Sequence, residues 1–230
     1  MLETMKGPAA ADYAEFPDFE GMETRGKLRE YAAYTYLNID SDTAVRLALE
    51  FMQEDPFASR ICALILDRSW RPAASRALLD LAGKSSWTAT IATALQVLKR
   101  RDPGMYITAL QMLRKELEDM APEFRTPVEQ FRYYLRRKRL VQAFGICREK
   151  ALVKTLANLL DPKDRGQALG KLVVSEENGV ENSYHRSVTE EALVAIQEIL
   201  EKDFGYLDNQ SADDRQAVIE RCKRFVRTRM

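Results

Sequence analysis

The sequence contains a single histidine, His185, and an odd number of cysteines that lie far apart in the chain. A single histidine excludes most zinc sites, and its position in a polar stretch excludes serine or cysteine hydrolysis that needs a well-placed imidazole on a helix. Cys62, Cys147 and Cys222 each fall in an apolar helical pattern, so we expect buried free thiols. No Cys-x-x-Cys pair and no phosphate-binding glycine loop occurs. We therefore expect a protein without enzymatic activity, metal or cofactor.

The sequence also lacks an excess of either charge and any long apolar run. Its 35 Lys and Arg residues balance 35 Asp and Glu residues, so electrostatic binding would need a local cluster of charge. No apolar run approaches the roughly 20 residues that span a bilayer, and the N-terminus lacks the features of a signal peptide. We expect a soluble, cytoplasmic chain with no membrane partner, unless a leader has been trimmed from it.

Apolar residues with helical spacing are what the sequence has in abundance. Five such patterns follow one another between Asp42 and Leu117, and the short connections between them favour antiparallel neighbours. The patterns are Val45, Ala48, Leu49, Met52; Phe57, Ile61, Leu64, Ile65; Ala74, Ala77, Leu78, Leu81; Trp87, Ile91, Leu95, Leu98; and Tyr106, Ala109, Leu110, Leu113, Leu117. We predict an all-α fold of stacked helical hairpins.

Signals for helix starts recur at regular intervals along the chain. Asp55-Pro56, Asp102-Pro103 and Thr126-Pro127 each place a capping side chain before a proline suited to the first helical turn. With starts predicted near residues 42, 56, 72, 86 and 103, alternate starts are about 30 residues apart, close to known helix-pair repeats. This spacing predicts roughly 10 to 12 helices in the whole chain.

Two segments have no helical period. Residues 1–24 are acidic and contain Tyr13, Phe16 and Phe19, which predicts either a flexible arm or a segment that lies in a groove of this or another molecule. Residues 175–187 are polar and predict an inserted loop. We expect residues 25–230 to form one helical-repeat domain that contains this loop.

The C-terminal region has a distinctive order of elements. A helix introduced by Ser187 and Glu190 precedes an aromatic turn at Gly205, and Ser211 and Asp214 introduce the last helix. The aromatic anchors of the turn are Phe204 and Tyr206, and the expected core residues of the last helix are Val218, Cys222, Phe225 and Val226.

This order resembles the C-terminal end of bacterial HEAT-repeat (armadillo-like) proteins. The close resemblance covers Ala192 to Arg227, although that family usually carries tryptophans where this chain has Cys222 and Phe225. It implies an α-α superhelix of stacked antiparallel helix pairs, whose usual role is to hold other macromolecules.

A basic and aromatic segment near the middle of the chain is the main candidate for a binding site. In a helix, Arg132, Arg136 and Arg139 share one face while Arg137 diverges. With Tyr133, this face could grip phosphates, an acidic peptide or the chain's own arm; the alternative is a solvated face on which arginine stems cover apolar surface. The candidate binding residues are Arg132, Tyr133, Arg136, Arg137 and Arg139, and a basic stripe could extend to Arg221, Lys223, Arg224, Arg227 and Arg229.

Three functions fit these patterns. The first is a scaffold that binds a protein or peptide partner along its concave face. The second is a nucleic-acid-binding protein, which extends to an enzyme like the DNA alkylpurine glycosylases that the resembled fold also hosts. Such an enzyme needs exposed aromatic side chains, whereas we expect Trp70 and Trp87 to be packing residues. The third is self-association, with the arm of one copy in the groove of the next.

Overall fold

The computed structural model describes residues 41–54, 62, 66–67, 72–85, 87–119, 123, 125–160, 186–208 and 210–230. Every regular element within these ranges is a helix, which confirms the predicted all-α class. The predicted arm at residues 1–24, the predicted helix start near residue 56, Trp70 and most of the predicted loop at residues 175–187 lie outside the described residues. Within the described ranges, no helix is both long and apolar enough to cross a membrane.

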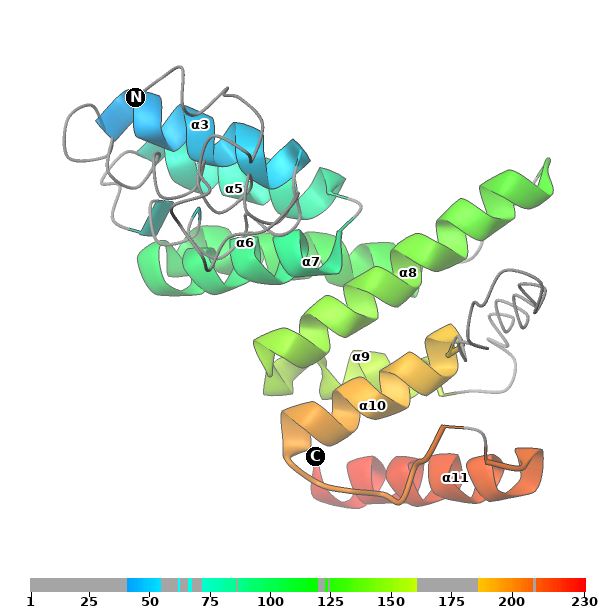
Figure 1. Cartoon of the computed structure of the whole chain (residues 1–230). Helices are drawn as coiled ribbons and strands as arrows, with labels where there is room; N and C mark the ends of the chain where they lie inside the picture. Colours follow the sequence, from blue (N-terminus) through cyan, green and yellow to red (C-terminus); the bar gives the residue numbers. More distant parts are fainter. Residues whose placement is uncertain are drawn as a thin grey trace, which may run out of the picture. The chain divides into compact units, whose positions relative to one another are not determined.

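Eight α-helices and one 3₁₀ turn make up the described part of the chain (Figure 1). It divides into two compact units, Met1–Met112 and Leu113–Met230, with the boundary inside α7. The elements are α3 (Ser41–Glu54), α5 (Pro72–Lys84), α6 (Thr88–Arg101), α7 (Pro103–Glu118), α8 (Pro127–Cys147), η3 (Lys150–Leu152), α9 (Val153–Asn158), α10 (Val188–Leu200) and α11 (Ala212–Arg229).

The first unit is organised around a hairpin of α5 and α6, and α3 also packs on α5. Arg101, at the end of α6, donates from Nε to the Ser75 hydroxyl near the start of α5 at 3.2 Å. A second donor of the same guanidinium, Nη1, reaches the Leu66 carbonyl. Since the end of one helix meets the start of the other, α5 and α6 are antiparallel, as the sequence predicted.

The predicted helix starts are largely confirmed. Helices α5 and α7 begin at the predicted residues 72 and 103, and α3 begins one residue before the predicted 42. Helix α6 begins at Thr88, two residues after the predicted start, with Trp87 in extended backbone before it. Trp87 is 43% exposed, so it is not fully buried, and its expected role as a packing residue stays a prediction.

The second unit depends on a long-range pair of helices, α8 and α10. Lys138 and Gln142 on α8 both reach Glu191 on α10, and Arg148, just after α8, reaches Glu201, just after α10. Gln142 and Glu191 are 49 residues apart in sequence, and Arg148 and Glu201 are 53 residues apart. Because partners advance together along both helices, α8 and α10 run parallel, as Figure 1 also shows.

Two of these helices approach unusually closely. A Cβ added to Gly145 of α8 would lie 3.1 Å from Cβ and 3.2 Å from Cα of Ala195 on α10. The absence of a side chain at residue 145 therefore sets the spacing of the pair. Phe144, next to this crossing, is fully buried.

The C-terminal turn and caps largely follow the sequence prediction. Ser187 and Glu190 form the predicted reciprocal capping box of α10. Gly205 has φ of +80°, and Phe204 and Tyr206 on either side of it are buried. At α11 the Ser211 hydroxyl accepts from the backbone N–H of Asp214 but donates to the Asp214 carboxylate. Ser211 therefore caps α11 as predicted, but the Asp214 carboxylate binds the Ser211 hydroxyl and not the Ser211 backbone N–H that a reciprocal capping box would use.

The cysteines are free, as predicted. Cys62 and Cys222 are buried, whereas Cys147 at the end of α8 is only partly buried. Burial raises the pKa of Cys222 to about 12, so this thiol stays protonated at neutral pH. The expectation of burial is thus correct for two of the three thiols.

Candidate functional site

Helix α8 carries the basic segment that the sequence singles out, and its start is fixed by two reciprocal bonds. The Thr126 hydroxyl accepts from the backbone N–H of Glu129, whose carboxylate accepts from the N–H of Thr126. The helix ends at Cys147, and Arg148 follows in the left-handed conformation with φ of 50°. These ends determine which side chains of α8 face the protein and which face solvent.

Arg136 is bound to its own chain. Its Nε and Nη2 donate to the two carboxylate oxygens of Glu116 on α7, at 2.9 and 3.1 Å. The two planar groups match in this two-point contact, which holds an arginine more firmly than a single ion pair does. Arg136 therefore joins α8 to the last turns of α7.

Arg137 and Tyr133 contact each other on α8. Arg137 is only 4% exposed, and its Nη1 donates to the Tyr133 hydroxyl at 2.6 Å and to the Asp119 carbonyl at 3.3 Å. The guanidinium also lies over the Tyr133 ring, 5.4 Å from its centroid. The sequence analysis placed Arg137 away from the shared face but gave no signal that it is buried.

The last two candidates, Arg139 and Arg132, differ in their surroundings. Burial, and secondarily the positive charge of Arg136, lowers the pKa of Arg139. This effect agrees with the predicted shared face of Arg136 and Arg139. Arg132 is exposed. The structure thus gives Arg136, Arg137 and Tyr133 internal partners and leaves Arg132 as the solvent-facing cation.

Apolar side chains that the sequence analysis did not select lie beside Arg132. Val128 and Phe131 are 58% and 45% exposed. They and Arg132 occupy positions i, i+3 and i+4, so the three side chains share one helical face. This face lies on the opposite side of α8 from the buried residues Leu140 and Phe144. The sequence signal for this exposed face was that Val128 and Phe131 lie out of phase with the helical pattern of Leu140 and Phe144.

The face of α8 toward α10 contains a buried charged network. Glu191 is 5% exposed; it accepts from Gln142 Nε2 at 2.9 Å and lies 3.4 Å from Lys138 Nζ. Its neighbour Glu190 pairs with Arg215 of α11 at 3.0 Å. These contacts join α10 to α8 and to α11.

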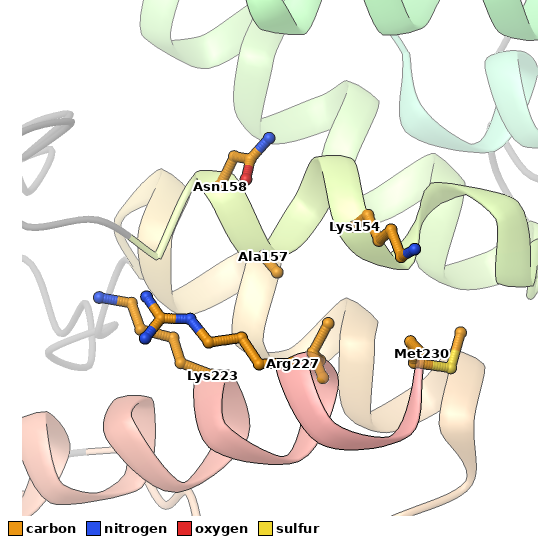
Figure 2. Close-up of a pocket in the computed structure, with 7 residues that line it drawn as sticks. Lys154, Ala157, Asn158, Lys223, Arg227 and Met230 are labelled. Atoms are coloured by element: carbon orange, nitrogen blue, oxygen red, sulfur yellow. The ribbon is translucent and has the colours of Figure 1, made fainter.

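A second candidate site lies between α9 and α11. It is a pocket of about 640 Å³ (Figure 2). Two of the basic residues that the sequence analysis noted in the last helix line it, whereas Lys154 was not foreseen as part of a site. The lining residues are Lys154, Ala157, Asn158, Lys223, Val226, Arg227 and Met230.

Comparisons with protein-family models, curated proteins and solved structures found no match to this chain. Among the described residues, no group of three or more His, Cys, Asp or Glu side chains is placed to hold a metal ion. The geometry and charge of the two candidate sites are therefore the features of the chain that bear on its function.

Proposed function

We propose that the chain is a non-enzymatic, HEAT-like helical-repeat protein that binds a protein partner through the exposed end of α8. We define this surface as Val128, Phe131 and Arg132. The proposed partner segment is acidic and carries an apolar side chain. Both parts of the proposal, the repeat architecture and the partner, rest on separate observations.

The repeat architecture is supported by the helix directions. A stack of helix pairs places equivalent helices of successive pairs side by side and parallel. The parallel packing of α8 and α10, with η3 and α9 between them in sequence, has this form. The antiparallel α5–α6 hairpin supplies the other contact that such a stack needs. We propose that these relations extend into an α-α superhelix.

The partner is inferred mainly from Phe131 and its neighbours. Aromatic residues and arginine contribute much of the binding energy in many protein interfaces. An exposed Phe131 beside Val128 offers an apolar contact, and the adjacent Arg132 offers a charge-assisted bond to a carboxylate. This combination favours an acidic protein segment over a nucleic-acid backbone, which needs several phosphate contacts.

A photo-crosslinking experiment tests this surface. A photoreactive phenylalanine analogue replaces Phe131 in one variant and Ile146 in a control variant, since Ile146 is 48% exposed on the same helix. We expect a discrete crosslinked protein from native lysate at position 131 and not at position 146. The same products at both positions would contradict the proposal, and a product of twice the chain mass would instead indicate self-association.

Affinity for the captured and purified protein provides the second test. We expect the double variant Phe131→Ala, Arg132→Ala to weaken binding by about 2 kcal/mol or more. The matched control Ile146→Ala should leave affinity unchanged. Titrations with DNA and RNA run in parallel; an affinity for these that falls steeply between low and moderate salt would favour the nucleic-acid alternative.

A further inference from the structure

The pocket between α9 and α11 is formed by one face of each helix. Lys154, Ala157 and Asn158 lie at i, i+3 and i+4 on α9, and Lys223 and Arg227 lie one turn apart on α11. Figure 2 shows Asn158 near Lys223 and Arg227 at one end of the pocket and Lys154 nearer Met230 at the other. The two helices are therefore antiparallel here, and both contribute to each end.

Positive charge is concentrated at this pocket. Lys154, Lys223 and Arg227 line it, and none of the other described lining residues has a carboxylate side chain. Lys223 pairs with Glu220 of the same helix at 3.4 Å. In the described part of the chain, neither Lys154 nor Arg227 forms an ion pair with a side chain. Like charges one turn apart on a helix, as at Lys223 and Arg227, repel each other, and a bound anion would offset this repulsion.

The wall between the charged ends is apolar. Val226 is buried beneath the pocket, and Ala157 and Met230 add aliphatic and thioether surface. The volume of about 640 Å³ lies within the range of sites for small organic molecules. A bare phosphate ion would fill only a small part of it. The lining thus fits a ligand with an anionic group and an apolar body.

We infer that this pocket binds a small organic molecule that carries a phosphate group. The guanidinium of Arg227 and the ammonium of Lys223 bind the phosphate oxygens, and the polar side chain of Asn158 lies at the same end. The apolar body lies against Val226 and Met230. This inference is independent of the protein-binding surface on α8, because the two sites share no residue.

Calorimetric titration with 1-naphthyl phosphate tests the inference directly. We expect saturable binding at low salt that is tighter than for 1-naphthol, inorganic phosphate or 1-naphthoate. Equally tight binding of 1-naphthol would show that the phosphate group contributes nothing to affinity. Equally tight binding of inorganic phosphate would show that the apolar body contributes nothing. Equal binding of 1-naphthoate would contradict the preference for phosphate, and no saturable binding would overturn the site.

Charge-matched variants separate a defined pocket from general attraction to a basic helix. We expect Arg227→Gln to weaken binding of 1-naphthyl phosphate about tenfold, equal to about 1.4 kcal/mol. Arg224→Gln removes the same charge from an exposed position of α11 that does not line the pocket, and should leave binding unchanged. Equal losses in both variants would contradict the inference. Circular dichroism of each variant checks that α11 remains folded, and Phe131→Ala should not alter the titration.

Discussion

The two units of the chain differ in how the helices within each unit are held together. In the first unit, α5 packs on α6, its neighbour in sequence, through an apolar interface with polar contacts from Arg101 at one end. In the second unit, α8 packs on α10, and Lys138 and Glu191 form an ion pair inside the contact, where both side chains are at most 12% exposed. Neighbour packing needs only matched apolar faces. Long-range packing here uses buried charges as well, which restrict the register of the two helices.

The largest expected effects on stability come from truncating a buried side chain in the core of each unit. Leu95→Ala in the first unit and Phe144→Ala in the second each remove a fully buried side chain, and each should lower the free energy of unfolding by about 3 kcal/mol or more. Denaturant titration measures this loss. Hydrogen exchange should show the loss of protection mainly in α5 and α6 for Leu95→Ala, and in α8 and α10 for Phe144→Ala. Equal loss in all four helices would show that the two cores do not open separately.

Breaking the partly buried ion pair of Glu190 and Arg215 should distinguish the two units more clearly. Glu190→Ala leaves Arg215 without its 3.0 Å partner and removes half of the capping box of α10. We expect a loss of about 3 kcal/mol, with a smaller loss for Glu190→Gln, which keeps the shape and a hydrogen-bonding group. In the first unit, Asp67→Ala breaks the more exposed pair with Arg100 and should cost less than about 1 kcal/mol. Similar losses from both alanine variants would contradict the contrast between the units.

Glycine substitutions test how rigid the two packings are. Gly145→Val places its side chain against the backbone of Ala195, so we expect destabilisation of about 1–3 kcal/mol. Among the described residues, Gly83→Ala in α5 meets only the flexible end of Met112, and the better helix propensity of alanine should keep the change within about 1 kcal/mol. Thermal unfolding of both variants measures the difference. A neutral Gly145→Val would show that α8 and α10 can move apart freely.

The smallest effect concerns pH and is confined to the second unit. The hydrogen bonds from Arg186 lower the pKa of Asp208 below its ordinary value. Its carboxylate therefore stabilises the fold above its unfolded-state pKa of about 4, and this contribution is lost as the pH falls through the lower folded-state pKa. Because the pair is partly exposed, Asp208→Asn should cost less than about 1 kcal/mol at pH 7. The difference from the unsubstituted chain should vanish in strong acid, and a difference that persists there would contradict this assignment.

The sequence predicted local structure better than it predicted long-range contacts. Capping residues and prolines act on the turn that contains them, so the starts of α7 and α8 and the cap of α10 followed from sequence. The antiparallel α5–α6 hairpin followed from its short connection. The burial of Arg137 did not, because it depends on Tyr133 and on the Asp119 carbonyl beyond the helix.

The candidate sites show the same limit. Spacing indicated that Arg136 and Arg139 share a face, but not that Glu116 on another helix binds Arg136. The pocket combines Lys154 of α9 with Lys223 and Arg227 of α11, and no pattern within either helix reveals that the two face each other. Phe131 was visible as an aromatic residue in a basic segment. Its exposure could have been predicted from spacing, because Phe131 lies out of phase with the buried Leu140 and Phe144.

The parallel register of α8 and α10 is the central claim, and a disulfide between Gly145→Cys and Ala195→Cys tests it most directly. A Cβ at residue 145 would lie 3.1 Å from Cβ of residue 195, slightly closer than the roughly 3.5–4.5 Å that a disulfide spans, so a small outward shift of the two helices allows the bond. In a chain whose three native cysteines are replaced by alanine, we predict that mild oxidation joins residues 145 and 195, as detected by peptide mass. The control pair Gly145→Cys and Val188→Cys should remain reduced. Preferential formation of the 145–188 bond would contradict the account, because it would place the start of α10 beside the end of α8.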